Sequence, residues 1–99
     1  MILKKHTQDR KLVLAICDND LLGKKFEEGN LQLDLTSEFY NGNNITEDEL
    51  KIQIRKAYII NAVGKETIDF LKKIDLISEK NIIRISTTPS AQILLGHGF

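Results

Sequence analysis

Carboxylates follow directly on the most apolar run of the chain, and they are the residues of this sequence best suited to acid–base catalysis or to binding. The run Lys11 to Cys17 leads into Asp18 and Asp20, with Lys24 and Glu27 further along. Two carboxylates brought together in a partly dry site can serve as general acid and general base. These four charged residues therefore form one candidate binding or catalytic site, and the alternative for the same residues is a solvated loop.

The acidic segment matches neither a calcium loop nor a nucleotide-binding P-loop. A calcium loop that starts at Asp18 needs an oxygen ligand at its fifth position and Glu at its twelfth, where the chain has Leu22 and Gly29. The Gly-Lys-Lys that follows lacks the spacing and the hydroxyl residue of a P-loop. We therefore exclude both of these sites.

Cys17 is the only cysteine, so the chain forms no internal disulfide. A nucleophile at a strand end is one interpretation, but the acidic neighbours would raise the thiol pKa, and no histidine lies near in sequence. We favour a small buried core residue. Because His6 and His97 are the only histidines and show no metal-ligand spacing, we expect neither a metal nor a cofactor.

Polar side chains surround the single proline near the end of the chain. Thr87, Thr88, Ser90 and Gln92 flank Pro89. They can donate hydrogen bonds to phosphate or to a partner's backbone, and the alternative is a simple polar turn.

Basic side chains form the third candidate surface. On a folded domain they would build an RNA-contacting patch, although the zero net charge argues against a dedicated non-specific binder, and solvated charges are the alternative. The candidates are Lys51, Arg55, Lys56, Lys72, Lys73 and Arg84.

A long helix from Thr46 to Gly64 is the element that we expect to position these residues. Thr46 and Glu49 form a capping-box pair, and Gly64 supplies a left-handed stop. At ~100° per residue the apolar positions fall on two nearly opposite stripes, so the helix is predicted to be covered from two sides. One stripe is Leu50, Ile54, Ala57 and Tyr58, and the other is Ile52, Ile59 and Val63.

Asn61 lies in the middle of the first stripe, where an unpaired side-chain amide costs on the order of 1–3 kcal/mol. One interpretation is local: the amide bonds the backbone where the helix ends at Gly64. The functional interpretation makes Asn61 a recognition amide that faces either the first loop's carboxylates or the turn at Pro89.

The fold class that follows is α+β. We predict a single domain over residues 1–99, with residues 96–99 as a frayed tail and about five short strands in the order β-β-β-α-α-β-β, packed on the two-sided helix and a second, shorter helix. Alternation of apolar and polar residues marks the third strand, and the first two strands form a hairpin. The predicted strands are 2–7, 11–17, 31–35, 82–86 and 91–95, and the second helix runs from residue 65 to about 75. For 91–95 the alternative is a helical turn, with Pro89 in its first turn after a Thr88 cap.

Composition is that of an ordinary globular chain, with 41% hydrophobic and 28% charged residues among 99. No apolar run approaches the ~20 residues that cross a bilayer, and the first residues lack a signal-peptide core. We therefore expect a cytoplasmic protein.

Short motifs spread over most of the chain occur in an order that is specific in combination. They are Cys17-Asp18, Leu21-Leu22-Gly23-Lys24, Phe26-Glu27-Glu28-Gly29, Leu31 with Leu33-Asp34, Phe39-Tyr40 with Gly42, Asn61 with Val63-Gly64, and Ile83-Arg84-Ile85 before Pro89 with Ala91-Gln92. Together they resemble the archaeal domain of unknown function 424 family. The chain departs from that pattern at Ser90, where we expect a histidine in the family. The resemblance implies an α+β fold, an archaeal cytoplasm and an association with the translation apparatus.

The leading functional expectation is a non-enzymatic module that binds RNA or a ribonucleoprotein partner through the basic patch and residues 87–92. The first alternative is a small-molecule or catalytic site in the loop 17–29. The second is a homo-oligomeric interaction scaffold, because a helix that is apolar on two sides exceeds what 99 residues readily cover.

Overall fold

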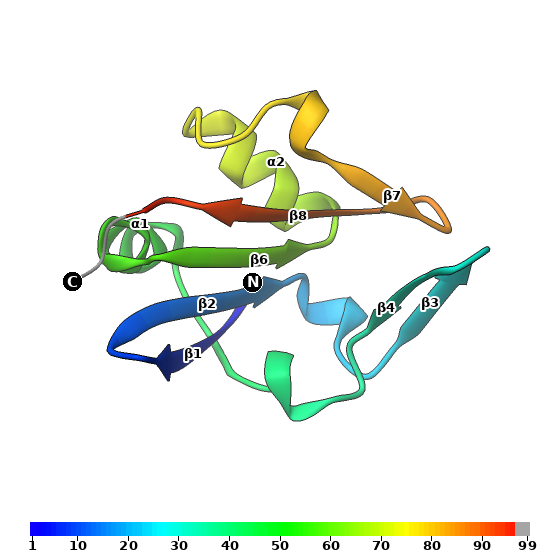
Figure 1. Cartoon of the computed structure of the whole chain (residues 1–99), viewed down its shortest axis with the longest axis horizontal. Helices are drawn as coiled ribbons and strands as arrows, with labels where there is room; N and C mark the ends of the chain where they lie inside the picture. Colours follow the sequence, from blue (N-terminus) through cyan, green and yellow to red (C-terminus); the bar gives the residue numbers. More distant parts are fainter. Residues whose placement is uncertain (97–99) are drawn as a thin grey trace.

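The computed structural model describes residues 1–96. Eight strands and two helices lie within this range (Figure 1). They are β1 (Ile2–Gln8), β2 (Lys11–Cys17), β3 (Lys25–Glu28), β4 (Leu31–Asp34), β5 (Asn43–Asn44), α1 (Glu47–Lys56), β6 (Ile59–Val63), α2 (Lys65–Lys73), β7 (Ile83–Ile85) and β8 (Thr88–Leu94). The α+β class is confirmed, with more strands than the five predicted, while most of the predicted tail, residues 97–99, lies outside the described residues.

Six strands form the main sheet, in the order β5-β1-β2-β6-β8-β7, and β3 pairs with β4 in a separate hairpin. The predicted β1–β2 hairpin is present, and its turn residues Asp9 and Arg10 have φ of 52° and 66°, as a two-residue hairpin turn requires. A similar turn at Ser86 and Thr87 joins β7 to β8. The β3 strand was not predicted, because the sequence of 17–29 indicated only a loop.

The predicted helix from Thr46 to Gly64 is wrong in its second half. Its start is correct, since the Thr46 side chain accepts a hydrogen bond from the Glu49 N–H at 3.2 Å, but α1 ends at Lys56. The following residues form β6, which pairs parallel to β2, and Gly64 joins a strand to a helix. The physical reason is that an apolar, β-branched run gains more from pairing inside a sheet than from continuing a helix.

The parallel pair of β2 and β6 places two strand ends side by side. Val13 pairs with Ile59 at one end and Cys17 with Val63 at the other. Since the carboxyl ends of parallel strands meet at one edge, the residue that follows β2, Asp18, lies next to the residue that follows β6, Gly64.

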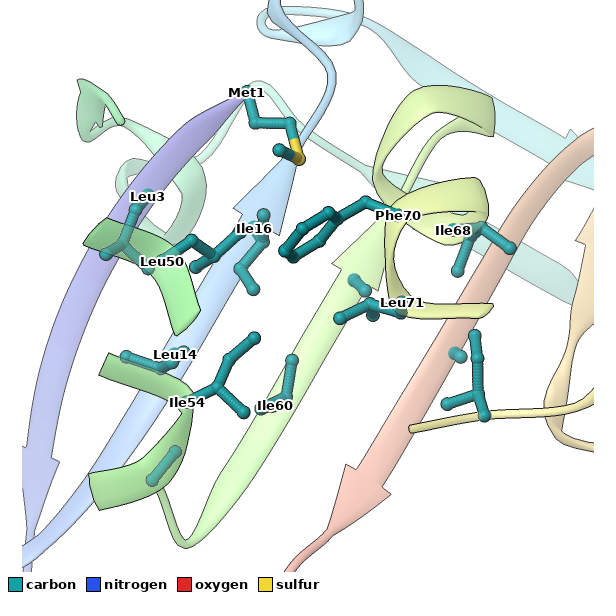
Figure 2. Packing of buried hydrophobic residues seen from close by; sticks show 14 residues of the cluster. Met1, Leu3, Leu14, Ile16, Leu50, Ile54, Ile60, Ile68, Phe70 and Leu71 are labelled. Carbon is teal, nitrogen blue, oxygen red and sulfur yellow. The ribbon is translucent and has the colours of Figure 1, made fainter. Parts of the chain in front are cut away.

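Both helices contribute to the core on one face of the main sheet. Figure 2 shows Leu50 and Ile54 of α1 and Phe70 and Leu71 of α2 packed over Ile16 and its neighbours. Side chains of alternate residues point to the opposite face. There the β3–β4 hairpin and residues 35–40 cover a smaller cluster, built on Ile2, Cys17, Leu35 and Val63.

The predicted two-sided helix therefore does not exist. Of its second stripe, Ile59 and Val63 belong to β6, and Ile52 alone stays on α1 with 50% of its surface exposed. Within residues 1–96 no helix is long and apolar enough to cross a membrane.

Candidate functional site

Asp18 is buried between the end of β2 and the start of α2. Its carboxylate accepts hydrogen bonds from the Glu66 N–H at 3.0 Å, the Thr67 N–H at 2.8 Å and the Thr67 hydroxyl at 2.8 Å. A negative charge at this position also faces the positive end of the helix dipole. Asp18 thus caps α2 from a distant strand, in place of a side chain at the cap residue itself, Gly64.

Gly64 fits this junction because it has no side chain. Its φ is +112°, and an added Cβ would lie 2.3 Å from the Cγ of Asp18. The Gly64 N–H donates to the Pro89 carbonyl at 2.9 Å, and the Asp18 N–H donates to the Val63 carbonyl at 3.1 Å. The junction therefore connects β2, β6, β8 and α2. Its carboxylate, Asp18, is one of the two that were candidates for acid–base chemistry.

The predicted site in the loop 17–29 is divided by the fold. A cleft of about 750 Å³ next to α2 is lined by Asp18 and Asp20, but neither Lys24 nor Glu27 lines it. Lys24 is exposed, and Glu27 lies on the distant hairpin, where it pairs with Lys25 at 3.2 Å. The four residues are not brought together as a single catalytic constellation.

Three other predicted residues do converge, on the sheet face opposite the helices. Asn61 of β6 pairs with Gln92 of β8, and Ser90 pairs with Val63 two residues further along. Together with Tyr40 they line a groove of about 160 Å³ between the sheet and the β3–β4 hairpin. The remaining proline-flanking residues lie apart from it: Thr87 sits in the β7–β8 turn, and Thr88 is buried.

Tyr40 is the groove residue that sequence reasoning did not select, although Phe39-Tyr40 was one of the motifs. Burial raises its pKa to about 12, with a smaller contribution from Cys17, so the phenol stays protonated at neutral pH. Within residues 1–96 the side chains of Tyr40, Asn61 and Gln92 form no hydrogen bond, whereas Ser90 donates to the Ile83 carbonyl at 3.1 Å. Three polar side chains of the groove thus have no protein hydrogen-bond partner within residues 1–96.

The predicted basic patch separates into a neutralised part and an unpaired part. Lys73 pairs with Glu47 at 3.1 Å, and Lys72 and Arg84 pair with Glu79 at 3.6 and 2.8 Å. The hydrogen bond from Arg84 lowers the pKa of Glu79, so this pair is charged at neutral pH. In the described part of the chain, the remaining predicted residues, Lys51, Arg55 and Lys56, form no ion pair.

The unpaired cations lie near other cations that the sequence did not single out. Arg55 and Lys56 close α1 just before Tyr58, whose N–H donates to the Leu12 carbonyl at 2.8 Å and whose ring lies 4.3 Å from the Lys11 ammonium. The β1–β2 turn and the start of β6 lie together at the left of Figure 1. We call the set Arg10, Lys11, Arg55 and Lys56 the basic end.

Comparison with known proteins places the chain in a family. A family model described as "Protein of unknown function (DUF424)" matches residues 5–95. The chain belongs to this family. The resemblance predicted from the sequence motifs is therefore confirmed. No curated protein matches.

Among solved structures, this DUF424 protein is similar to one titled "Crystal structure of an uncharacterized conserved protein from Methanopyrus kandleri". The two share 28% sequence identity over 97% of this chain and 91% of the other, with a TM-score of 0.79. The junction and groove described above therefore belong to a fold that recurs in a solved relative.

Cys17 gives this DUF424 protein a predictable response to alkaline pH. Burial, with a smaller effect of Asp18, raises the thiol pKa from 9.0 to about 11, and the Tyr40 pKa is raised from 10.0. The unfolded chain releases these protons at lower pH than the folded protein does. The free energy of unfolding is therefore undiminished by these groups below pH 9 and falls as the pH rises toward 11. At ~1.4 kcal/mol per pKa unit, the rise from 9.0 to about 11 corresponds to a total loss of roughly 3 kcal/mol from Cys17 once the pH exceeds 11. Urea unfolding over this pH range measures it.

The matched variant is Cys17→Ala, in which the part of the alkaline loss that comes from the thiol is absent. Equal pH profiles for the two proteins would contradict the assignment of this loss to Cys17.

Proposed function

We propose that this DUF424 protein is a non-enzymatic module that binds RNA, alone or within a ribonucleoprotein, across the uncovered part of its main sheet. The observation that carries the proposal is the basic end: its cations form no ion pair within residues 1–96, while Lys72, Lys73 and Arg84 each contact a carboxylate. We define the open sheet face as Lys11, Ile59, Asn61, Gln92 and Leu94, which lie on the face opposite the helices.

Electrostatics supports a local site in a chain of zero net charge. Phosphates are bound by cations that replace condensed counterions, so what matters is a local cluster of cations that are not paired with carboxylates. Asp9 lies in the same turn as Arg10, but within residues 1–96 it forms no ion pair with these cations. On α1 the acidic residues Glu47, Asp48 and Glu49 stand in the first turn, and Arg55 and Lys56 in the last. The helix thus presents its positive side chains at the same end of the sheet as Lys11.

The open sheet face also has aromatic, amide and apolar groups, which bind the bases of single-stranded RNA as cations bind its phosphates. Tyr58 supplies an aromatic ring next to Lys11. Further along the same face lie the amides of Asn61 and Gln92, and Leu94 is 67% exposed. Aromatic and apolar surface beside cations is typical of sheets that bind unpaired nucleotides.

The alternatives have less support. The catalytic alternative stays a prediction, although the Asp18 carboxylate is hydrogen-bonded to the start of α2, and of the other three residues only Asp20 lines the same cleft. The scaffold alternative also stays a prediction, but it has lost its basis, because the second apolar stripe of the helix is part of β6.

The test is a double variant, Arg55→Ala with Lys56→Ala, titrated with transfer and ribosomal RNA by fluorescence anisotropy at several salt concentrations. Wild-type affinity is expected to fall steeply with salt, and the variant to bind all sequences more weakly, with a slope smaller by about 0.7 for each lost phosphate contact. Both side chains are exposed, so the fold is retained.

The matched control is Lys72→Ala with Lys73→Ala, which removes equal charge from cations that already have carboxylate partners. It is expected to bind nearly as well as wild type. Absence of salt-dependent binding by the wild type at low ionic strength, with no ribosomal material co-sedimenting from cell extract, would overturn both the RNA proposal and its link to translation.

A further inference from the structure

The residues that line the groove beside Asn61 indicate which kind of chemical group could bind there. We call the set Tyr40, Asn61 and Gln92 the amide groove, and its apolar walls include Leu33, Val63 and Ile83. Among the residues that the structure describes, none of those that line the groove is charged. A phosphate or carboxylate would enter without a counter-charge, which is costly away from water, so the group that fits is neutral.

The polar groups of the amide groove match a flat group with alternating donors and acceptors. A side-chain amide carries an NH₂ donor beside a carbonyl acceptor, and a protonated phenol adds one donor and one acceptor. The edges of nucleobases carry this pattern, and Asn and Gln amides recognise them with paired hydrogen bonds. None of these three side chains has a hydrogen-bond partner within residues 1–96, so their donors and acceptors are available to bind the edge of a base.

Size and position agree with a base that belongs to a longer strand. The groove measures about 160 Å³, which is below the ~300 Å³ at which pockets for whole cofactors begin. Asn61 pairs with Ala15, four residues along β2 from Lys11, or roughly 13 Å at ~3.3 Å per residue. A short single-stranded segment can therefore contact the basic end with its phosphates and place a base in the groove.

We propose that the amide groove of this protein holds one unpaired nucleobase of the bound RNA and thereby sets a base preference. The proposal rests on the proposed function, to which it adds the chemical group that is recognised. The cations of the basic end, which reach this face at Lys11, favour a nucleic acid strand, which is anionic along its whole length, over a second copy of this chain, whose net charge is zero.

The test uses labelled homopolymers of adenylate, cytidylate, guanylate and uridylate, about ten nucleotides long, titrated by fluorescence anisotropy. Wild type is expected to prefer one base. Asn61→Ala, Gln92→Ala and Tyr40→Phe are each expected to weaken binding of the preferred homopolymer roughly tenfold, and to leave the salt dependence unchanged because they remove no phosphate contact.

Gln32→Ala is the matched control, because it removes an exposed amide from β4, where the neighbouring Leu33 and not Gln32 lines the groove. It should retain the base preference. Gln92 is itself exposed, so its variant keeps the proposal testable even where Asn61→Ala, in a central strand, fails to fold.

Failure of this proposal is distinct from failure of the RNA proposal. Equal binding of all four homopolymers, with no effect of the three groove variants but a loss in the Arg55 and Lys56 variant, would overturn the base site alone. A groove variant that changes self-association and not RNA binding would overturn it too, since the occupant would then be a second copy. No binding of any RNA by wild type would overturn both.

Discussion

Replacing Asp18 with alanine is expected to lower the free energy of unfolding by about 3 kcal/mol. The substitution removes an acceptor from two backbone N–H groups and one hydroxyl at the start of α2, and leaves them in a site where Thr67 has no exposed surface. When buried donors lose a charged acceptor, the folded state is destabilised by their full desolvation free energy. Urea unfolding followed by circular dichroism measures the change.

Two further variants separate the capping role of Asp18 from its charge. Asp18→Asn keeps the shape but only one acceptor oxygen, so an intermediate loss is expected. Asp20→Ala removes an exposed carboxylate nearby and is expected to change stability by no more than ~0.5 kcal/mol. A loss below ~1 kcal/mol for Asp18→Ala, equal to that of Asp20→Ala, would show that the three hydrogen bonds contribute little.

The elements that sequence predicted correctly are those marked by local signals. The β1–β2 hairpin is set by alternation and turn residues, the start of α1 by the cap at Thr46, and the second helix by the helical spacing of its apolar residues, all within a few positions. The region 57–63 failed, because an apolar run such as Ile59 to Val63 fits a helical stripe and a buried strand equally well. What decides between them is pairing with β2, more than forty residues earlier, which no local pattern reveals.

Part of the lining of the candidate groove was selected from the sequence, but its arrangement was not predicted. Asn61, Ser90 and Gln92 were each selected, yet the strand register that brings them together depends on the β6–β8 pairing. Asn61 was expected either to bond the backbone near Gly64 or to face the first loop's carboxylates or the turn at Pro89. In the structure the Gly64 N–H donates to the Pro89 carbonyl and the Asp18 carboxylate fills the space that a side chain at Gly64 would need, while Asn61 lines a groove on the sheet face opposite the helices.

Gly64→Ala is expected to destabilise the protein by about 3 kcal/mol or more, for two reasons that add. A φ of +112° is strained for any residue with a side chain. In addition, the new Cβ would lie 2.3 to 2.6 Å from the Asp18 carboxyl atoms and displace them from the start of α2. Gly23→Ala is the matched control, because its φ of +88° carries backbone strain while, apart from its chain neighbours, no atom of residues 1–96 lies within 4 Å of the added Cβ.

The double variant Asp18→Ala with Gly64→Ala tests whether the two residues act as one unit. Once the carboxylate is gone, the added Cβ meets no carboxyl group, so only the backbone strain of Gly64→Ala remains, about 1–2 kcal/mol. Its cost in the Asp18→Ala background should therefore approach that of Gly23→Ala and be smaller than in the wild type, which gives a coupling energy of roughly 1–2 kcal/mol. Strict additivity in urea unfolding would mean that Gly64 is required for its backbone conformation alone, and that the cap on α2 does not depend on the missing side chain.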